Sequence, residues 1–500
     1  MVQFNSTFRR LATLFLRALS VPHLSNAAAA ASNGPRVLIL GGGVSGVIAA
    51  RTLHQSGIDN FVIVEARDEL GGRMMTTTFG GKTIEQGANW IQGTQTGKGP
   101  ANPIFTLAKK HNVSTQLNDW SGSVTTFDTT GAVDWLDVFD ASGDDFDDMT
   151  VAAGARVDQN LVDLSARTGY SLIKAKPKTD QERAAEYYQY DWEYAQTPEE
   201  SSLIASAWGN NFTYNTDQGG FSEDNLMSID QRGFKALIQL EAQDFLTPSQ
   251  IQLNSVVKNI TYSKSGVTVT LTNGKTLTGD YALCTFSLGV LQNDDVKFQP
   301  ELPDFKQEAI QSMVMGTFTK IFLKFPKKFW FDTEMGIFAD STRGRYPVWQ
   351  SLDHPNFFPG SGILFVTVTG DFSIRIEALS DQKVQAEVME VVRMMYPNIT
   401  VPEPSEFFFP RWHTNTLFRG SYSNWPPALS SQHIDNLRAN VGRLYFSGEA
   451  TSRKYFGFLQ GAYFEGQTAA NNILACIKGP TCANLEHFTQ INNVLPYENN

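Results

Sequence analysis

Residues 36–46 read RVLILGGGVSG, and residues 61–73 read FVIVEARDELGGR. The apolar run 37–40 is typical of a buried parallel strand, and the glycines after it introduce a helix over about residues 44–56. Gly41 lets the chain turn sharply, Gly43 lets the backbone approach a pyrophosphate, and Gly46 lets the helix pack closely on the strand. A glycine-rich turn without a ligand is the alternative, but strand, glycines, helix and second strand follow one another here as they do in a dinucleotide site.

The residues around these glycines extend the predicted site. The helix that begins near Ser45 points its free N–H groups and its positive dipole end at the phosphates. Glu65 ends the second strand, where an acid accepts hydrogen bonds from a ribose. Arg73 follows Gly71 and Gly72. This pattern resembles the extended motif of FAD enzymes with a glutathione-reductase-like fold, in which the arginine reaches the phosphates, and it favours FAD over a nicotinamide cofactor.

Length and composition limit the class of protein. A chain of 500 residues suits two or three domains, and 41% hydrophobic with 18% charged residues is typical of a globular protein. The formal net charge of −11 argues against nucleic-acid binding through a basic surface. An acidic surface concentrates cationic small molecules, although solubility alone also accounts for it. The aspartates between residues 134 and 148 are interpreted as a solvated face or loop.

The N-terminal segment 1–34 contains three arginines and no acid, an apolar core and a run of alanines. These features predict a secretory signal, with a mitochondrial presequence as the alternative. No stretch reaches the ~20 apolar residues of a membrane-spanning helix. Cys476 and Cys482 are close enough in sequence to form a small disulfide loop, although buried thiols are also possible. Acceptor sequons permit glycosylation at Asn5, Asn112, Asn211, Asn259 and Asn398.

Other segments show the organisation of the chain. Residues 182–206 predict a helix, and residues 251–289 predict strands with an Asn273-Gly274 hairpin turn. Strands are expected over 317–325, 363–369 and 443–446, and helices over 381–395 and 459–474. Segments that resemble a cofactor domain lie at both ends, with a β-rich block between them. We therefore expect an α/β plus α+β protein, in which a discontinuous Rossmann-like FAD domain carries an inserted substrate domain of mixed sheet and helices.

The expected domains follow this alternation. A targeting segment covers residues 1–34, and a C-terminal tail covers 486–500. The FAD domain takes residues 35–115, 216–300 and 411–485. The substrate domain takes the helical segment 116–215 and the sheet segment 301–410.

Taken together, these segments resemble the flavin-dependent amine oxidases, and within them the secreted polyamine oxidases of plants and fungi. The resemblance covers about residues 35–482. Its ordered motifs, besides the two opening stretches, are Glu85-Gln-Gly-Ala-Asn-Trp90, Asp230-Gln-Arg-Gly233, Thr319-Lys320-Ile-Phe-Leu-Lys-Phe-Pro326, Tyr422-Ser-Asn-Trp-Pro426, and Gly448-Glu449-Ala450 with Gly461-Ala462.

The resemblance implies further cofactor contacts. Val256 would meet the adenine through its backbone, Trp412 would lie beside the isoalloxazine, and Glu449 would lie near the ribityl-phosphate region. The helix after residue 458 would point its N-terminus at the electron-rich edge of the flavin. No cysteine stands near this segment, which predicts non-covalent FAD. Cofactor residues implied by the same motifs are Ala88, Asn89, Trp90 and Gly448.

Lys320 is the predicted catalytic residue. In the family that it resembles, this lysine hydrogen-bonds a water beside flavin N5, and burial would lower its pKa so that it serves as an acid–base partner. The alternative is an ordinary strand lysine facing solvent, like Lys324. No Ser–His–Asp signature, HExxH motif or cluster of metal ligands is evident, so we expect no metal.

The substrate residues implied by the resemblance are an aromatic pair and a tunnel acid. Tyr422 and Phe458 would sandwich an aliphatic amine, and Glu193 would hold a distal ammonium, unless it is a solvated helix residue. Gln92 stands where plant polyamine oxidases have a glutamate, and Phe318 and Phe458 stand where they have tyrosines. The site is therefore expected to be less negative, with room for acetylated polyamines or hydrophobic amines.

The expected reaction is FAD-dependent oxidation of an amine to an imine, which water hydrolyses, with O2 reduced to hydrogen peroxide. An L-amino-acid oxidase is the nearest alternative, but it needs an arginine for the substrate carboxylate, and none is evident. A non-catalytic FAD-binding protein is the alternative of another class.

Overall fold

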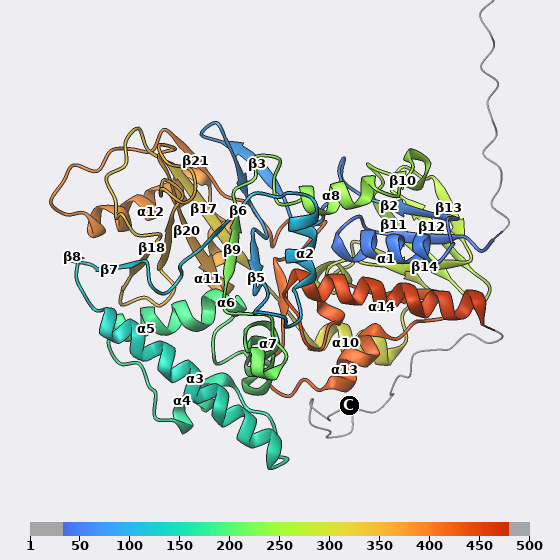
Figure 1. Ribbon diagram of the computed structural model, residues 1–500, viewed down its shortest axis with the longest axis horizontal. Helices are drawn as coiled ribbons and strands as arrows, with labels where there is room; N and C mark the ends of the chain where they lie inside the picture. Colours follow the sequence, from blue (N-terminus) through green and yellow to red (C-terminus); the bar gives the residue numbers. More distant parts are fainter. Residues whose placement is uncertain (1–33, 480–500) are drawn as a thin grey trace, which may run out of the picture. The chain divides into compact units, whose positions relative to one another are not determined.

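A computed structural model describes residues 34–479 (Figure 1). Its first sheet is parallel, in the order β10 (Ile251–Gln252), β2 (Phe61–Val64), β1 (Val37–Leu40), β14 (Tyr281–Cys284) and β23 (Leu444–Phe446). In register, Val37 lies opposite Phe61 on one side and Tyr281 on the other. Because these strands come from segments far apart in sequence, the domain is discontinuous, as expected.

Alternate residues of β1 pack against different layers. Val37 and Ile39 face helices α1 (Val44–Gln55), α2 (Pro103–Lys110), α8 (Ala236–Gln243) and α14 (Leu459–Lys478). Leu38 and Leu40 face a second sheet. Burial on both faces explains why the strand is apolar throughout instead of alternating.

Close helix packing depends on two glycines. Figure 1 shows α1 and α14, from opposite ends of the chain, lying side by side. A Cβ on Gly466 of α14 would lie 2.3 Å from the carbonyl oxygen of Ser45, and a Cβ on Gly46 would lie 2.0 Å from that of Gly41. The contacts of Gly46 with the Gly41 carbonyl and the Ile39 side chain leave no room for a Cβ between helix and strand.

The second sheet has the order β13 (Thr276–Gly279), β12 (Val267–Leu271), β11 (Val257–Tyr262) and β15 (Lys297–Gln299). The predicted hairpin turn joins β12 to β13, with Gly274 at φ +83° and its N–H donating to the carbonyl of Leu271. Along the chain, the short helix α9 (Leu288–Leu291) precedes β15, and α10 (Asp304–Ser312) and α13 (Ser431–Arg438) follow it.

The third large sheet has seven strands. Their order is β21 (Glu406–Phe408), β17 (Phe318–Lys324), β20 (Ile363–Thr369), β19 (Val348–Ser351), β18 (Met335–Phe338), β7 (Val124–Asp128) and β8 (Gly131–Ala132). Helix α12 (Asp381–Met395), which matches its predicted bounds, packs on this sheet through Val388 and Val392, and α11 (Gly370–Glu377) follows β20. The sheet joins strands from both predicted substrate segments, and the domain boundaries themselves stay a prediction.

Small sheets connect these layers. They are the pair β3 (Thr76–Phe79) and β4 (Lys82–Glu85), the pair β16 (Val314–Gly316) and β22 (Tyr422–Asn424), and a sheet in the order β5 (Trp90–Gln92), β9 (Asn225–Ser228) and β6 (Thr115–Leu117). Two of these strands, β5 and β22, carry predicted site residues.

The helical segment differs from the expectation. It comprises α3 (Leu136–Asp158), α4 (Ala166–Leu172), α5 (Asp180–Glu186), a π-helical turn η1 (Tyr187–Asp191), α6 (Trp192–Tyr194) and α7 (Leu203–Tyr214). The prediction of one helix over 182–206 is wrong, because Ala195 is left-handed at φ +54° and residues 195–202 are not helical. The acidic cluster lies at the start of α3 and along it, with most aspartates exposed, as a solvated face.

Candidate active site

One large cavity lies where the parallel sheet and the seven-stranded sheet meet. Its volume is about 390 Å³. The predicted residues that line it are Gly41, Gly43, Ser45, Glu65, Arg73, Ala88, Asn89, Trp90, Gln92, Glu193, Val256, Phe318, Lys320, Trp412, Tyr422, Gly448, Glu449 and Phe458. The structure therefore brings together all the predicted cofactor, substrate and catalytic residues except Gly46, which packs behind the wall.

The glycine end of the cavity is a backbone cradle. Gly43 precedes α1 and offers no side-chain cap, so the first N–H groups of the helix remain open to the cavity. A Cβ added to Gly43 would meet only the Cα of Gly72, at 3.7 Å. Glu65 accepts from the N–H of Gly42 at 2.7 Å and of Arg67 at 2.8 Å. This cradle suits a pyrophosphate and a ribose, as a dinucleotide cofactor requires.

Glu449 organises the middle of the cavity. Its Oε1 accepts from Arg73 Nη1 at 2.9 Å, and its Oε2 accepts from Ser423 Oγ at 2.6 Å and the N–H of Gly457 at 2.7 Å. Arg73 also donates to the carbonyl of Ser421 at 2.8 Å. The buried carboxylate thus holds an arginine at the cavity wall, where it can meet an anionic phosphate.

Two further groups at this end have unused hydrogen-bonding capacity. Trp412 Nε1 is buried without a protein partner. Helix α14 begins after Phe458 without a side-chain cap. Two uncapped helix N-termini therefore adjoin one cavity, and both favour electron-rich groups. The residues present fit a flavin dinucleotide.

Lys320 is buried, with 1% of its surface exposed, so the solvent-facing alternative is wrong. Its Nζ donates to Asn89 Oδ1 at 2.6 Å and to the carbonyl of Gly87 at 2.7 Å, and it lies 4.7 Å from the ring centroid of Trp90. Burial lowers the pKa of Lys320 to about 7. Lys324, by contrast, is partly exposed and pairs with Glu406.

Glu85 lies behind Lys320, and sequence reasoning had named it only as part of a motif. Its Oε1 accepts from the N–H of Phe234 at 2.6 Å, and its Oε2 has no protein partner. Burial raises the pKa of Glu85 to about 7. A cavity of 20 Å³, large enough for one water molecule, adjoins both side chains. The lysine thus sits beside a second buried group that can share its proton.

The other end of the cavity is aromatic. Phe318 and Tyr422 lie with ring centroids 6.0 Å apart. Trp90, Trp120 and Trp192 contact one another edge to face, with centroids 5.0 to 5.7 Å apart. These rings line an apolar end of the cavity that is suited to an alkyl chain.

Several lining residues were missed from the sequence. Trp120 lies in a loop that carries no motif, and Trp192 and Tyr194 belong to the segment that was expected to be a regular helix. The high aromatic content of residues 187–194 is the one signal that pointed to Trp192 and Tyr194. Trp120 is placed by Asn118, whose Oδ1 accepts from the indole N–H groups of both Trp90 and Trp120.

Glu193 lines this aromatic end and is half-buried, so its side chain faces the cavity rather than the outer surface. Its Oε1 accepts from Gln92 Nε2 at a long 3.4 Å. Burial raises the pKa of Glu193 to about 7. The other lining acids have partners. Glu65 accepts from backbone N–H groups, Glu449 pairs with Arg73, and Asp295 pairs with Arg419 at 2.7 Å. Among the described lining residues, Glu193 is the carboxylate without a cation or a strong donor.

Some predictions fall partly outside the described residues. Cys482, the segment 1–33 and Asn5 lie there, so the disulfide and the targeting signal stay predictions. Cys476 lies on α14, where its Sγ is 2.9 Å from the hydroxyl of Tyr445. Within residues 34–479, none of the helices combines the length and hydrophobicity needed to cross a membrane.

Comparisons with known proteins agree with this geometry. The chain is 35% identical over 494 residues to polyamine oxidase 6 of Oryza sativa subsp. japonica, covering 94% of this chain and 97% of that one. It is 35% identical over 478 residues to polyamine oxidase 1 of Zea mays, covering 91% and 93%. The solved structure of putrescine oxidase bound to putrescine matches with a TM-score of 0.71 and 18% identity over 88% of this chain and 99% of that one, which shows the fold.

The family described as flavin containing amine oxidoreductase matches residues 44–474. That match includes Gly46, Lys320 and the start of α14. The chain belongs to this family and is a flavin-dependent amine oxidase.

Proposed function

We propose that the protein binds FAD non-covalently and oxidises a secondary amine within a polyamine. The observation that carries the substrate class is the half-buried carboxylate of Glu193, which lines the aromatic end of the cavity without a cationic partner. Burying a carboxylate without a cation is costly, and a distal ammonium of a bound polyamine would offset that cost. The rice and maize relatives are named as polyamine oxidases, which supports the same class.

FAD, rather than a smaller flavin, suits the length of the site. Glu65 and the cradle at Gly43 lie at the adenosine end, with Val256 lining the adenine position, and Arg73 and Glu449 lie between them and Lys320. The described lining residues include no cysteine or histidine, the side chains that commonly tether flavins, which supports a non-covalent cofactor. When bound, the flavin accepts a hydride equivalent from the amine and passes the electrons to O2, giving hydrogen peroxide.

The protein residues orient the amine and control its proton. Tyr422, Phe458 and Phe318 hold the carbon chain, while the long contact between Gln92 and Glu193 sets the depth at which an ammonium binds. Lys320 donates short hydrogen bonds to Asn89 and Gly87 and a long one, 3.5 Å, to the carbonyl of Glu85, so its third proton is weakly held and can pass to a water in the cavity. With a pKa near neutrality, it can exchange that proton with the amine through the water.

Mono-acetylated polyamines are expected substrates as well. Glu193 is the one acid without a cationic or backbone partner among the described lining residues. One distal ammonium of the substrate can therefore pair with it, and a second ammonium adds little binding energy. Phe318 and Phe458 add apolar surface without hydroxyl acceptors. An amino-acid substrate fits less well, because Arg73 is the arginine that lines the described cavity, and it is bound to Glu449.

A peroxide-coupled substrate screen tests the proposal. We expect turnover with spermine, spermidine and N1-acetylspermine, weak turnover with simple monoamines, and none with L-amino acids. Faster turnover of an L-amino acid than of any polyamine would contradict the substrate class. Acid denaturation should release FAD into the supernatant, and flavin that stays with the precipitate would contradict non-covalent binding.

We further propose that the protein is secreted with Cys476 paired to Cys482. The composition of residues 1–34 and the spacing of the two cysteines support this. Intact-mass measurement of the secreted protein should show one disulfide. Recovery from the mitochondrial matrix with both thiols free would support the presequence instead.

A further inference from the structure

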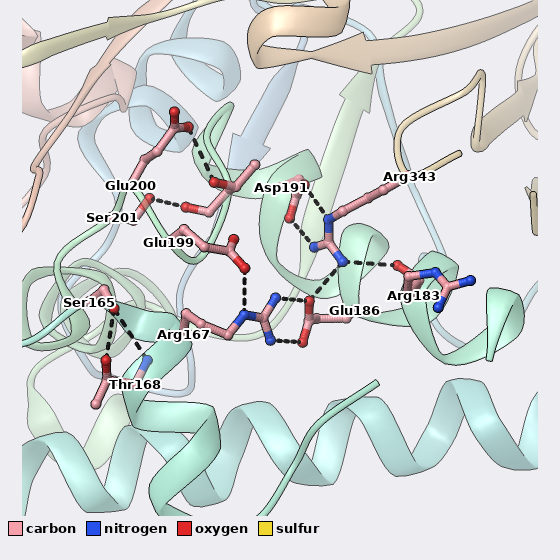
Figure 2. Close-up of polar contacts among 11 residues, drawn as sticks. Ser165, Arg167, Thr168, Arg183, Glu186, Asp191, Glu199, Glu200, Ser201 and Arg343 are labelled. Atoms are coloured by element: carbon pink, nitrogen blue, oxygen red, sulfur yellow. Dashed lines mark hydrogen bonds and ion pairs between the residues drawn. The ribbon is translucent and has the colours of Figure 1, made fainter. Parts of the chain in front are cut away.

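A partly buried ion-pair network lies behind the aromatic end of the cavity (Figure 2). At its centre, the guanidinium of Arg343 contacts two carboxylates. Its Nη2 and Nε donate to Asp191 at 2.6 and 3.1 Å, and its Nη1 lies 2.8 Å from Glu186 Oε1. Both carboxylate side chains are at most 5% exposed. Removing these charges from water costs free energy, which offsets much of the attraction between them. The network therefore contributes mainly by fixing the geometry of the chain.

A second arginine extends the network along the chain. Arg167 donates to both oxygens of Glu186, at 2.7 and 2.5 Å, and through Nε to Glu199 at 2.6 Å. The held carboxylates, at 186, 191 and 199, therefore bracket residues 192–194. Figure 2 shows Arg343 and Arg167 approaching Glu186 from opposite sides.

The network coincides with the π-helical turn η1. Hydrogen bonds in a π-helix join residues five apart, so Glu186 and Asp191 lie on one side of the turn, where one guanidinium reaches both. The wider turn changes the direction of the side chains that follow it. A π-helical turn is intrinsically unfavourable, and Arg343 supplies contacts from outside the helix that stabilise it.

The segment held in this way is the one that enters the cavity. Trp192, Glu193 and Tyr194 follow η1 directly, and all three line the cavity. The carboxylate of Glu193 has only the 3.4 Å contact with Gln92, while its backbone carbonyl accepts from the Tyr422 hydroxyl at 2.8 Å. Its direction is therefore set by the backbone, which the network fixes at Asp191, two residues earlier.

We propose that Arg343 is a positioning residue for amine recognition: it holds the π-helical turn that directs Glu193 and Trp192 into the cavity. Arg343 itself does not line the cavity, and it acts from the loop between β18 and β19 of the seven-stranded sheet. The inference rests on the proposed function, since it gives Glu193 the distal ammonium as its ligand. In addition, a residue outside the cavity, Arg343, controls how well the distal ammonium is recognised.

The test compares two probes that differ only in terminal charge. Spermidine carries two terminal amino groups, and N-propylbutylamine is the same secondary amine without them. The quantity measured is the ratio of kcat/KM for spermidine to that for N-propylbutylamine. We expect Arg343→Gln to lower this ratio about 10-fold or more through KM, with flavin content unchanged.

Arg345→Gln is the matched control. Arg345 lies in the same loop, has a similar exposed fraction (24% against 22%), and makes its ion pairs with Asp340 and Glu390 instead of the turn. It should leave the ratio within about twofold of wild type. Should Arg343→Gln fail to fold, Asp191→Asn removes the same charge contact with an isosteric side chain and is expected to lower the ratio in the same direction.

Glu193→Gln separates the two hypotheses. In that background, Arg343→Gln should have little further effect on the ratio, because both substitutions remove one interaction. If Glu193→Gln lowers the ratio but neither Arg343→Gln nor Asp191→Asn does, the positioning role is overturned and the proposed function stands. An unchanged ratio in Glu193→Gln overturns the assignment of the ammonium to Glu193, and the inference with it. An equal loss in Arg345→Gln would show a general effect of the loop and overturn the specific role of Arg343.

Discussion

The two ends of the cavity are built in different ways. The cofactor end is mostly backbone: glycines at 41, 43, 71 and 72, two helix N-termini, and carboxylates whose oxygens are already held. The amine end is mostly side chains, with indole and phenyl rings and one unpaired acid. A backbone cradle tolerates almost no added atoms, whereas a side-chain channel can be adjusted residue by residue. Substitutions at the cofactor end should therefore abolish function, and those at the amine end should change its selectivity.

Gly43→Val should have the largest effect. The residue has φ −79°, which valine tolerates, and the added side chain would occupy space that the cofactor needs. We expect a folded protein without flavin, checked by the flavin absorbance and the thermal melting of the purified protein. Gly46→Val is the contrasting control, because its Cβ would clash with the Gly41 carbonyl and destabilise the fold itself. Retention of flavin by Gly43→Val would contradict the backbone cradle.

Lys320→Met comes next and tests the boundary between the two ends. It keeps the length of the side chain but removes the proton and the donors to Asn89 and Gly87. Flavin should remain bound, while its anaerobic reduction by amine slows by about 100-fold or more. Stopped-flow absorbance gives the rate directly. An unchanged rate would remove Lys320 from the chemistry.

Glu193→Gln should reduce kcat/KM for spermidine on the order of 10- to 100-fold, because a buried charge contact is lost. Its pH dependence is equally diagnostic. Burial raises the pKa of Glu193 to about 7, so below that pH the group is neutral and attracts the ammonium weakly. In the wild type, KM for spermidine should fall as the pH rises through about 7. The variant should lack this change, and a persisting one would assign it to another group.

Gln92→Glu should have the smallest effect. The new carboxylate would lie close to Glu193, whose Oε1 is 3.4 Å from Gln92 Nε2. Two carboxylates so close together share a proton near neutral pH, so only part of the added charge is available to the substrate. We expect a rise of about 3- to 10-fold in the preference for spermine over N1-acetylspermine, from roughly 1 kcal/mol of added attraction. A ratio of kcat/KM for spermine to that for N1-acetylspermine within about twofold of wild type would show that position 92 does not discriminate between substrates by charge.

The same contrast explains what could be predicted from the sequence. The cradle depends on local rules: an apolar strand, glycines at fixed spacing and a helix start, all visible in residues 37–46. The resemblance located the motif around Lys320. This motif forms β17, and the position of Lys320 along that strand directs its side chain into the cavity. Local patterns suffice where backbone geometry makes the site.

The amine end was predicted less completely, for a physical reason. The π-helical turn is bound by Arg343 and Arg167 from outside the segment, and Ala195 is left-handed. Helix propensity in residues 182–206 favours the regular helix that does not form. Trp120 is placed by Asn118, from a loop without periodicity. These positions depend on partners far away in sequence, which no local window contains.

The close packing of α14 on α1 has a consequence for how the protein is made. The wall at Ser45 is completed by Gly466, and Ser45 Oγ shares a hydrogen bond of 2.7 Å with Ser447. During synthesis, the first strand and helix emerge hundreds of residues before the partners that close the pocket. Such distant contacts form slowly, so the nascent chain must keep β1 and α1 from aggregating in the meantime. The wall beside the flavin is therefore complete only after residue 466 has been synthesised, which makes cofactor capture a late step of folding.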